Sequence, residues 1–143
     1  MTKKNCDYII IEKRCGGLEH ISDFIQERCL VARLSFKRTW ELMLVVDEIC
    51  SGIILNSQNK ESELKILWRD ENAFVEVEIR DSDQPFNPLV PPEDEKECPE
   101  LGAMGAYLIE KMVDMASYKR VDGHNSVLIK KNKRNSKKNH ARS

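Results

Sequence analysis

Apolar residues recur along this chain with two periods, and each period predicts a different kind of element. Where polar and apolar residues alternate, or where β-branched residues run together, we expect a strand. Turn-forming residues at 70–72 and at Asp122–Gly123 separate two pairs of such segments, which predicts two antiparallel hairpins. The expected strands are Tyr8–Glu12, Glu63–Arg69, Phe74–Arg80, Ser117–Val121 and Ser126–Lys130.

Three other segments place apolar residues three and four positions apart, which is the spacing of an amphipathic helix. These helices are expected from Leu18 to Ala32, from Thr39 to Asn56, and onward from Leu101. The connection at Ser35–Arg38 can supply a helix N-cap. The resulting order, β-α-α-β-β-α-β-β, predicts an α/β two-layer sandwich in which about three helices cover one face of a mostly antiparallel sheet.

The charge of the chain is unevenly distributed along its length. The formal net charge is −1 over 143 residues, but residues 130–143 hold seven of the 23 basic residues and no acidic one. The residues before them therefore carry 16 basic against 24 acidic residues. We interpret residues 1–131 as one domain and residues 132–143 as a basic, disordered tail. No aromatic residue is interleaved with the basic ones, so we expect a solvated end rather than a nucleic-acid-binding arm.

Two features that the sequence lacks narrow the class of protein. It has no apolar run approaching the roughly 20 residues of a membrane span, and it opens on no signal peptide. Its five cysteines are odd in number and scattered, without a C-x-x-C pair, and its three histidines are far apart. Reduced thiols in a cytoplasmic protein fit this pattern better than disulfides or a zinc site do.

The candidate chemistry lies between Asp81 and Asp114. Asp81 ends an alternating strand, and a loop rich in proline and acidic residues follows it over 82–100. Gly102 and Gly105 then open an apolar-periodic helix. Glycines at a helix N-terminus let backbone N–H groups approach an anion such as phosphate. This pattern predicts a nucleotide site in which Asp81 accepts from a base edge, the glycines bind phosphates, and the loop forms a lid.

The helix expected at Thr39–Asn56 carries a further candidate, Glu48. Glu48 and Gly52 lie one turn apart on one helix face, beside the buried stripe. Considered on the helix alone, Glu48 is a solvated charge at the rim of that stripe. Whether Glu48 belongs to a functional site depends on which element packs against this face of the helix.

Together these segments resemble a known family, the small ATP-binding domains of anti-sigma-factor serine kinases, within the superfamily that includes gyrase and the histidine kinases. The resemblance covers residues 8–131 and rests on three motifs in the family's order. ELMLVVDEICSGIILNS resembles the helix that ends as Glu-x-x-x-Asn followed by His. RDSDQPFNP resembles the Asp-x-Gly-x-x-Phe-Asp-Pro turn, and LGAMGAYLIEKMVDMASYKRVDGHN is similar to the Gly-Gly-Leu-Gly helix. The implied fold is the histidine-kinase-type ATP-binding fold.

The resemblance also implies cofactors and residue roles. ATP and Mg²⁺ are the implied cofactors, Glu48 falls on the general base that activates a hydroxyl, and Asp81 falls on the adenine-binding carboxylate. The start of the Gly-Gly-Leu-Gly helix, which holds the nucleotide, corresponds to Gly102, Met104, Gly105 and Ala106.

Two positions depart from the family's pattern. The magnesium-binding Asn is Gly52 here, and Asn56 cannot replace it, because it lies about 12 Å from Glu48 along an ideal helix. Asp47 is the neighbouring carboxylate that could reach in. Asp83 replaces the Gly of the turn, and because two carboxylates this close repel one another, we expect one of them to titrate high.

Two functions compete on this basis. The first is a cytoplasmic serine/threonine protein kinase that regulates transcription, binding a sigma factor or similar target and phosphorylating a Ser of a small antagonist; a homodimer is consistent with it. The second is a catalytically degenerate module that acts by partner binding only, which Gly52 and Asp83 favour. A domain detached from a histidine kinase is disfavoured, because no His-bearing dimerisation helix is present. An α/β domain whose glycines serve packing alone is disfavoured by three motifs in register.

Overall fold

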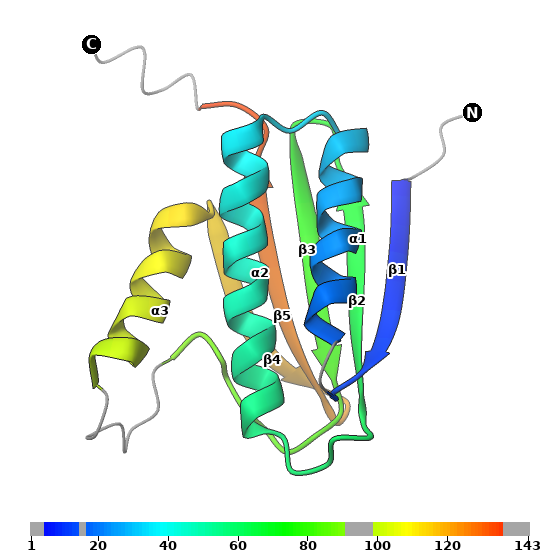
Figure 1. The fold of residues 1–143 in the computed structure, drawn as a ribbon, viewed down its shortest axis with the longest axis vertical. Helices are drawn as coiled ribbons and strands as arrows, with labels where there is room; N and C mark the ends of the chain where they lie inside the picture. Colours follow the sequence, from blue (N-terminus) through cyan, green and yellow to red (C-terminus); the bar gives the residue numbers. More distant parts are fainter. Residues whose placement is uncertain (1–4, 15–16, 91–98, 136–143) are drawn as a thin grey trace.

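The computed structural model describes residues 5–14, 17–90 and 99–135 (Figure 1). The order of its elements is the expected one. In chain order they are β1 (Asn5–Glu12), α1 (Gly17–Val31), α2 (Phe36–Asn56), β2 (Glu63–Asp70), β3 (Phe74–Asp81), α3 (Pro99–Met112), β4 (Met115–Val121) and β5 (His124–Asn132).

The five strands form one sheet in the order β1-β2-β3-β5-β4, and every neighbouring pair is antiparallel. α1 and α2 lie against one face of this sheet, and α3 lies beside α2 on the side of β4 (Figure 1). None of the described helices covers the other face, which we call the open face. The predicted two-layer α/β sandwich is confirmed, with a sheet that is wholly antiparallel.

The core lies between the sheet and the first two helices. Side chains of β2 and β3 alternate, so that every second one is buried under the helices and the others lie on the open face. α1 and α2 supply the opposite wall through apolar residues spaced by three and four. The buried apolar residues of these elements are Ile21, Ile25, Cys29, Leu42, Val45, Val46, Ile49, Cys50, Ile53, Leu64, Ile66, Trp68, Val75, Val77 and Ile79.

Several elements extend beyond the ranges expected from the sequence. α2 begins at Phe36, before Thr39, because the Ser35 side chain accepts a hydrogen bond from the backbone N–H of Arg38 and caps the helix there. β5 continues to Asn132, and Lys133 then forms an ion pair with Asp70. Packed structure therefore continues past residue 131, where we placed the end of the domain. The expected tail from 136 to 143 lies outside the described residues.

The turn between β4 and β5 has the geometry that its sequence predicts. Asp122 has φ of 49° and Gly123 has φ of 78°, so both central residues of the two-residue turn lie in the left-handed region. Such a turn matches the right-handed twist of the strands. Within the described part of the chain, no helix is long and apolar enough to cross a membrane.

Candidate functional site

The acidic candidate of α2 and a glycine candidate of α3 are neighbours. Glu48 lies on the exposed edge of α2, and Gly105 is a buried position of α3. A Cβ atom added at Gly105 would come within 2.5 Å of Glu48 Oε2 and 3.2 Å of Glu48 Cδ. Because residue 105 has no side chain, a carboxylate from α2 can lie against the backbone of α3. Glu48 is therefore more than a solvated rim charge.

Gly52, one turn further along α2, faces open space. A Cβ atom there would meet nothing within 4 Å. Asp47, which we considered as a substitute ligand, is exposed. Across the described residues, no three His, Cys, Asp or Glu side chains are grouped so that they could hold a metal ion. Among the described residues, none places a side chain at position 52, where the resemblance implies a ligand of Mg²⁺.

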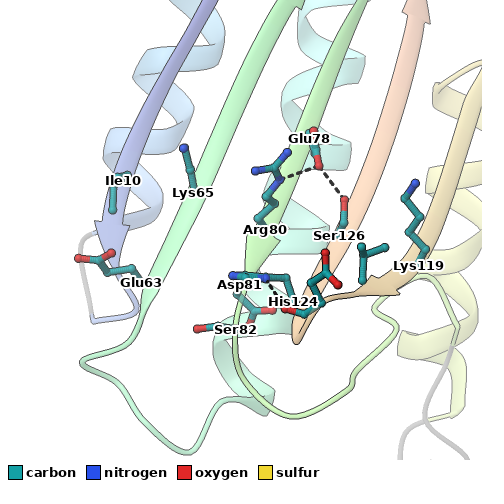
Figure 2. Close-up of a pocket in the computed structure, with 12 residues that line it drawn as sticks. Ile10, Glu63, Lys65, Glu78, Arg80, Asp81, Ser82, Lys119, His124 and Ser126 are labelled. Atoms are coloured by element: carbon teal, nitrogen blue, oxygen red, sulfur yellow. Dashed lines mark hydrogen bonds and ion pairs between the residues drawn. The ribbon is translucent and has the colours of Figure 1, made fainter.

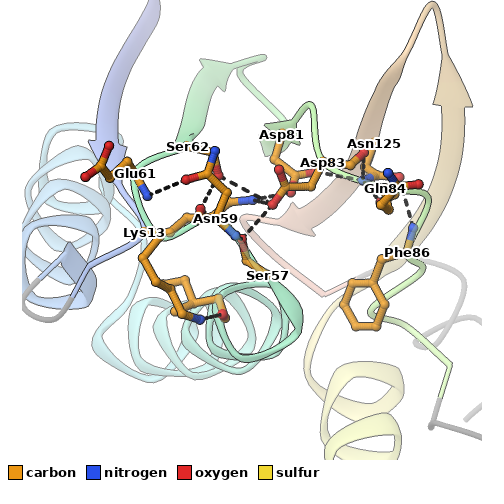
Figure 3. Close-up of polar contacts among 12 residues, drawn as sticks. Lys13, Ser57, Asn59, Glu61, Ser62, Asp81, Asp83, Gln84, Phe86 and Asn125 are labelled. Carbon is orange, nitrogen blue, oxygen red and sulfur yellow. Dashed lines mark hydrogen bonds and ion pairs between the residues drawn. The ribbon is translucent and has the colours of Figure 1, made fainter.

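Asp81 ends β3 on the helix side of the sheet and is only 6% exposed. Both oxygens of its carboxylate have partners within the protein (Figure 3). Oδ2 accepts from Lys13 Nζ at 2.6 Å, and Oδ1 accepts from Asn125 Nδ2 at 2.8 Å. An adenine amino group would need one of these oxygens as its acceptor. Asp81 lies where we expected it, but it is buried and each of its oxygens already accepts a hydrogen bond from the protein.

Lys13 is a site residue that the sequence analysis missed. It directly follows β1, its side chain is 0% exposed, and its ammonium pairs with Asp81 and Asp83 at 2.6 Å each. A lysine buried this deeply needs carboxylate partners, because its charge has lost its hydration. The strand period was the available signal. Ile9 and Ile11 pack against the core, so the next residue in that alternation, 13, falls on the same face.

Asp83 binds the same ammonium and anchors the end of α2. Its Oδ2 also accepts from Ser57 Oγ at 2.6 Å and from Ser62 Oγ at 3.4 Å. Burial alone would raise the pKa of Asp83, but hydrogen bonds from Lys13 and Ser57 outweigh burial and hold the pKa below its ordinary value. Our expectation of a raised value is therefore wrong for Asp83, because a buried cation lies between the two acids.

Asn125 of β5 connects this cluster to the loop that follows β3. Its Nδ2 donates to the backbone oxygen of Gln84 at 2.9 Å, and its Oδ1 accepts from the backbone N–H of Phe86 at 3.2 Å and from Tyr118 Oη at 2.6 Å (Figure 3). The start of the expected lid is thus held to the sheet. Residues 91–98, its middle, lie outside the described part.

The expected phosphate-binding residues all fall in the first two turns of α3. These are Gly102, Met104, Gly105 and Ala106. Gly105 is placed by its contact with Glu48, whereas the surroundings of the other three side chains lie outside the described residues. Their contact with phosphate stays a prediction.

A hollow of about 710 Å³ lies on the open face of the sheet, away from the helices (Figure 2). Side chains of both charges line it, including Lys65, Glu78 and Arg80. Arg80 is held by an ion pair to Glu78 at 2.7 Å, and Glu78 also accepts from Ser126 at 2.9 Å. The hollow shares Asp81 with the cluster of Figure 3, but Glu48 and Gly105 do not line it.

The sheet with its three helices, the acid of α2 against α3, and the carboxylate at the end of β3 define the architecture of a histidine kinase-like ATPase domain. The model of that family matches residues 11–131, and the chain belongs to it. No curated protein matches the chain. The resemblance to this class that the motifs indicated is confirmed.

One solved structure with a similar fold contains the RsbU and RsbW domains of Rv1364c from Mycobacterium tuberculosis. The TM-score is 0.62 at 9% sequence identity, and the match covers 89% of this chain and 32% of that one. At this identity the likeness concerns the fold alone. The chain spans about a third of that structure's length.

Proposed function

We propose that this protein is a regulatory module that acts by binding a protein partner, on the fold of an anti-sigma-factor kinase but without magnesium-dependent phosphoryl transfer. The observation that carries this proposal is the open space at Gly52. Magnesium keeps several waters and takes few protein oxygens besides phosphate, so the loss of one amide ligand removes much of the protein's share. In the described residues, no side chain takes the place of that ligand.

The partner class comes from the family resemblance. A sigma factor or similar transcription regulator, or a small antagonist of the anti-sigma type, is the expected partner, in the cytoplasm. The acidic body of the chain, with 16 basic against 24 acidic residues before residue 130, argues against nucleic acid as the partner.

The second candidate function is a serine/threonine protein kinase, and the contact between Glu48 and Gly105 favours it. Glu48 would act as the general base on a Ser hydroxyl of the antagonist, because a carboxylate held beside the phosphate-binding helix is where such a base is needed. Asp81 would read adenine. This candidate needs both the metal and the base acceptor, but position 52 has no side chain to bind a metal and Asp81 is already paired with Lys13 and Asn125.

Calorimetric titration with ATP, with and without Mg²⁺, separates the two candidates. For the partner-binding module we expect weak or undetectable ATP binding that Mg²⁺ does not strengthen. For the kinase, binding would be tight, would require Mg²⁺, and would disappear in Asp81→Asn. Tight magnesium-dependent binding by the natural sequence would overturn the proposal.

Gly52→Asn is the complementary variant, because the open space at Gly52 accommodates a side chain. If the missing amide is what removes the metal, this variant should gain a dependence of ATP affinity on Mg²⁺. Asn56→Ala, one turn further along α2, provides a matched control that should not.

A further inference from the structure

We propose that Lys13 is an internal ligand of the base-reading carboxylate, which closes the adenine site from within. Its ammonium donates to Asp81 Oδ2 at 2.6 Å, the kind of position from which an adenine amino group would donate. The other oxygen is held by Asn125 at 2.8 Å. This inference rests on the family resemblance in taking Asp81 as the position of base recognition, and it deepens the proposed function by giving a reason for weak ATP binding.

The geometry makes Lys13 part of the fold rather than a mobile surface side chain. Its side chain is 0% exposed, and its backbone N–H donates to the carbonyl of Ser62 at 3.0 Å, which continues the pairing of β1 with β2. Withdrawing the ammonium would leave two buried or half-buried carboxylates, Asp81 and Asp83, facing each other without a cation. The closed arrangement is therefore the stable one.

An adenine amino group competes poorly with this ammonium. The bond from Lys13 to Asp81 joins an ammonium to a carboxylate, so both of its partners are ionised. The exocyclic amine of adenine is neutral, so its bond to Asp81 would have one ionised partner, whereas displacing Lys13 would break two bonds in which both partners are ionised. The natural sequence should bind ATP weakly or not at all through Asp81.

Lys13 and Asp83 carry opposite charges and form an ion pair within the cluster. Asp83 stands where the resembling motif has Gly, and its carboxylate holds the second side of the Lys13 ammonium at 2.6 Å. One cation and two carboxylates carry a formal charge of −1, and Asp81 alone carries the same charge. Replacing Lys13 and Asp83 together therefore opens the position without changing its net charge.

The test is a calorimetric titration with ATP, without Mg²⁺, of the double variant Lys13→Ala/Asp83→Gly and of the natural sequence. We expect ATP to bind the double variant at least about tenfold more tightly, since a hydrogen bond to a charged acceptor becomes available. Adding Asp81→Asn to the double variant should remove the gain. Lys65→Ala, which removes a lysine from the open face, is the matched control and should gain nothing.

Two results would overturn the inference. One is equal ATP affinity in the natural sequence and the folded double variant, whether both bind or neither does. The other comes from the natural sequence itself, labelled with ¹⁵N at the lysine side chains. The shielded Lys13 ammonium should give a slowly exchanging signal that millimolar ATP leaves unchanged, and loss of that signal on adding ATP would show that the nucleotide displaces Lys13.

These outcomes are distinct from a failure of the proposed function. If the natural sequence binds ATP tightly only with Mg²⁺, the partner-binding module is wrong. If the double variant gains nothing while the natural sequence stays indifferent to Mg²⁺, the internal ligand is wrong and the module stands.

Discussion

Gly105 and Gly52, on neighbouring helices, lie under opposite steric constraints. At Gly105 a side chain would collide with the Glu48 carboxylate, whereas at Gly52 it would meet nothing within 4 Å. Glycine weakens a helix interior by about 1 kcal/mol relative to alanine. At Gly105 the absence of a side chain allows the close approach of Glu48. At Gly52 no neighbouring atom requires a glycine.

A double-mutant cycle between Gly105 and Glu48 tests that contact. In a Glu48→Ala background, Gly105→Ala should raise the free energy of unfolding by about 1 kcal/mol, the difference in helix propensity. In the natural background the gain should be clearly smaller, because the Glu48 carboxylate must move away from the new methyl group. Urea unfolding of the four proteins provides the measurement. Equal gains in the two backgrounds would contradict the contact.

At the scale of elements, the periods of the sequence predicted the type and order of each helix and strand, but the ends depended on contacts that a pattern does not show. α2 starts at Phe36 because of one hydrogen bond to Ser35. β5 continues to Asn132 because β3 lies beside it from Phe74 onward. The sheet order β1-β2-β3-β5-β4 likewise depends on packing between distant segments.

The site was only partly predictable for a related reason. Asp81 and Glu48 could be placed by motif and spacing, and both lie at their expected positions on β3 and α2. Lys13 belongs to a run of charged residues, EKR, that is typical of a solvated strand end. Its burial requires Asp81 and Asp83, which are 68 and 70 residues away in the chain. A pairing at that separation is a property of the assembled sheet.

Lys131 holds α3 to the rest of the molecule. It is 5% exposed, and its Nζ donates to the carbonyl oxygen of Met112, at the end of α3, and to Glu41 Oε1 of α2. A cation at the C-terminus of a helix satisfies carbonyl groups that lack partners within the helix. One side chain of β5 thus connects both helices that carry the candidate site.

Lys131→Met should therefore loosen α3 and destabilise the fold. We expect a loss of about 2–4 kcal/mol in the free energy of unfolding, because the half-buried carboxylate of Glu41 and a carbonyl lose their partner. Amide hydrogen exchange in the last turn of α3 should accelerate. The neighbouring Lys130, which lies 3.9 Å from Glu76 on the open face, is the control, and Lys130→Met should cost less than about 1 kcal/mol. Similar losses of unfolding free energy in the two variants would argue against a stabilising role of the Lys131 contacts with Met112 and Glu41.

Across the whole molecule, charge is arranged differently on the two faces of the sheet. On the helix side, buried lysines at 13 and 131 each pair with carboxylates from other elements. On the open face, Glu78 accepts from Arg80 at 2.7 Å, from Arg69 at 2.9 Å and from Ser126 at 2.9 Å. The pKa is held below its ordinary value at Asp83 on the helix side and at Glu78 on the open face, so protonation of these two carboxyls should weaken the fold.

The loss of unfolding free energy at acid pH should depend on Glu78 in particular. Burial alone would raise its pKa, but hydrogen bonds from Arg80, Arg69 and Ser126 outweigh burial and lower the pKa from 4.5 to about 2. Because the folded value is below the ordinary one, this stability is present above pH 4.5 and is lost as the pH falls toward 2.

The contribution of Glu78 is on the order of 1–3 kcal/mol, and Glu78→Gln should remove it from the difference in unfolding free energy between pH 6 and pH 3. Glu76→Gln makes the same chemical change on the same strand and should leave that difference largely in place. Chemical denaturation at the two pH values measures both variants. If Glu78→Gln keeps the full difference, acid sensitivity arises elsewhere. Among the described residues, Asp70 beside Lys133 and Asp83 beside Lys13 also have a lowered pKa and would then be the groups to replace.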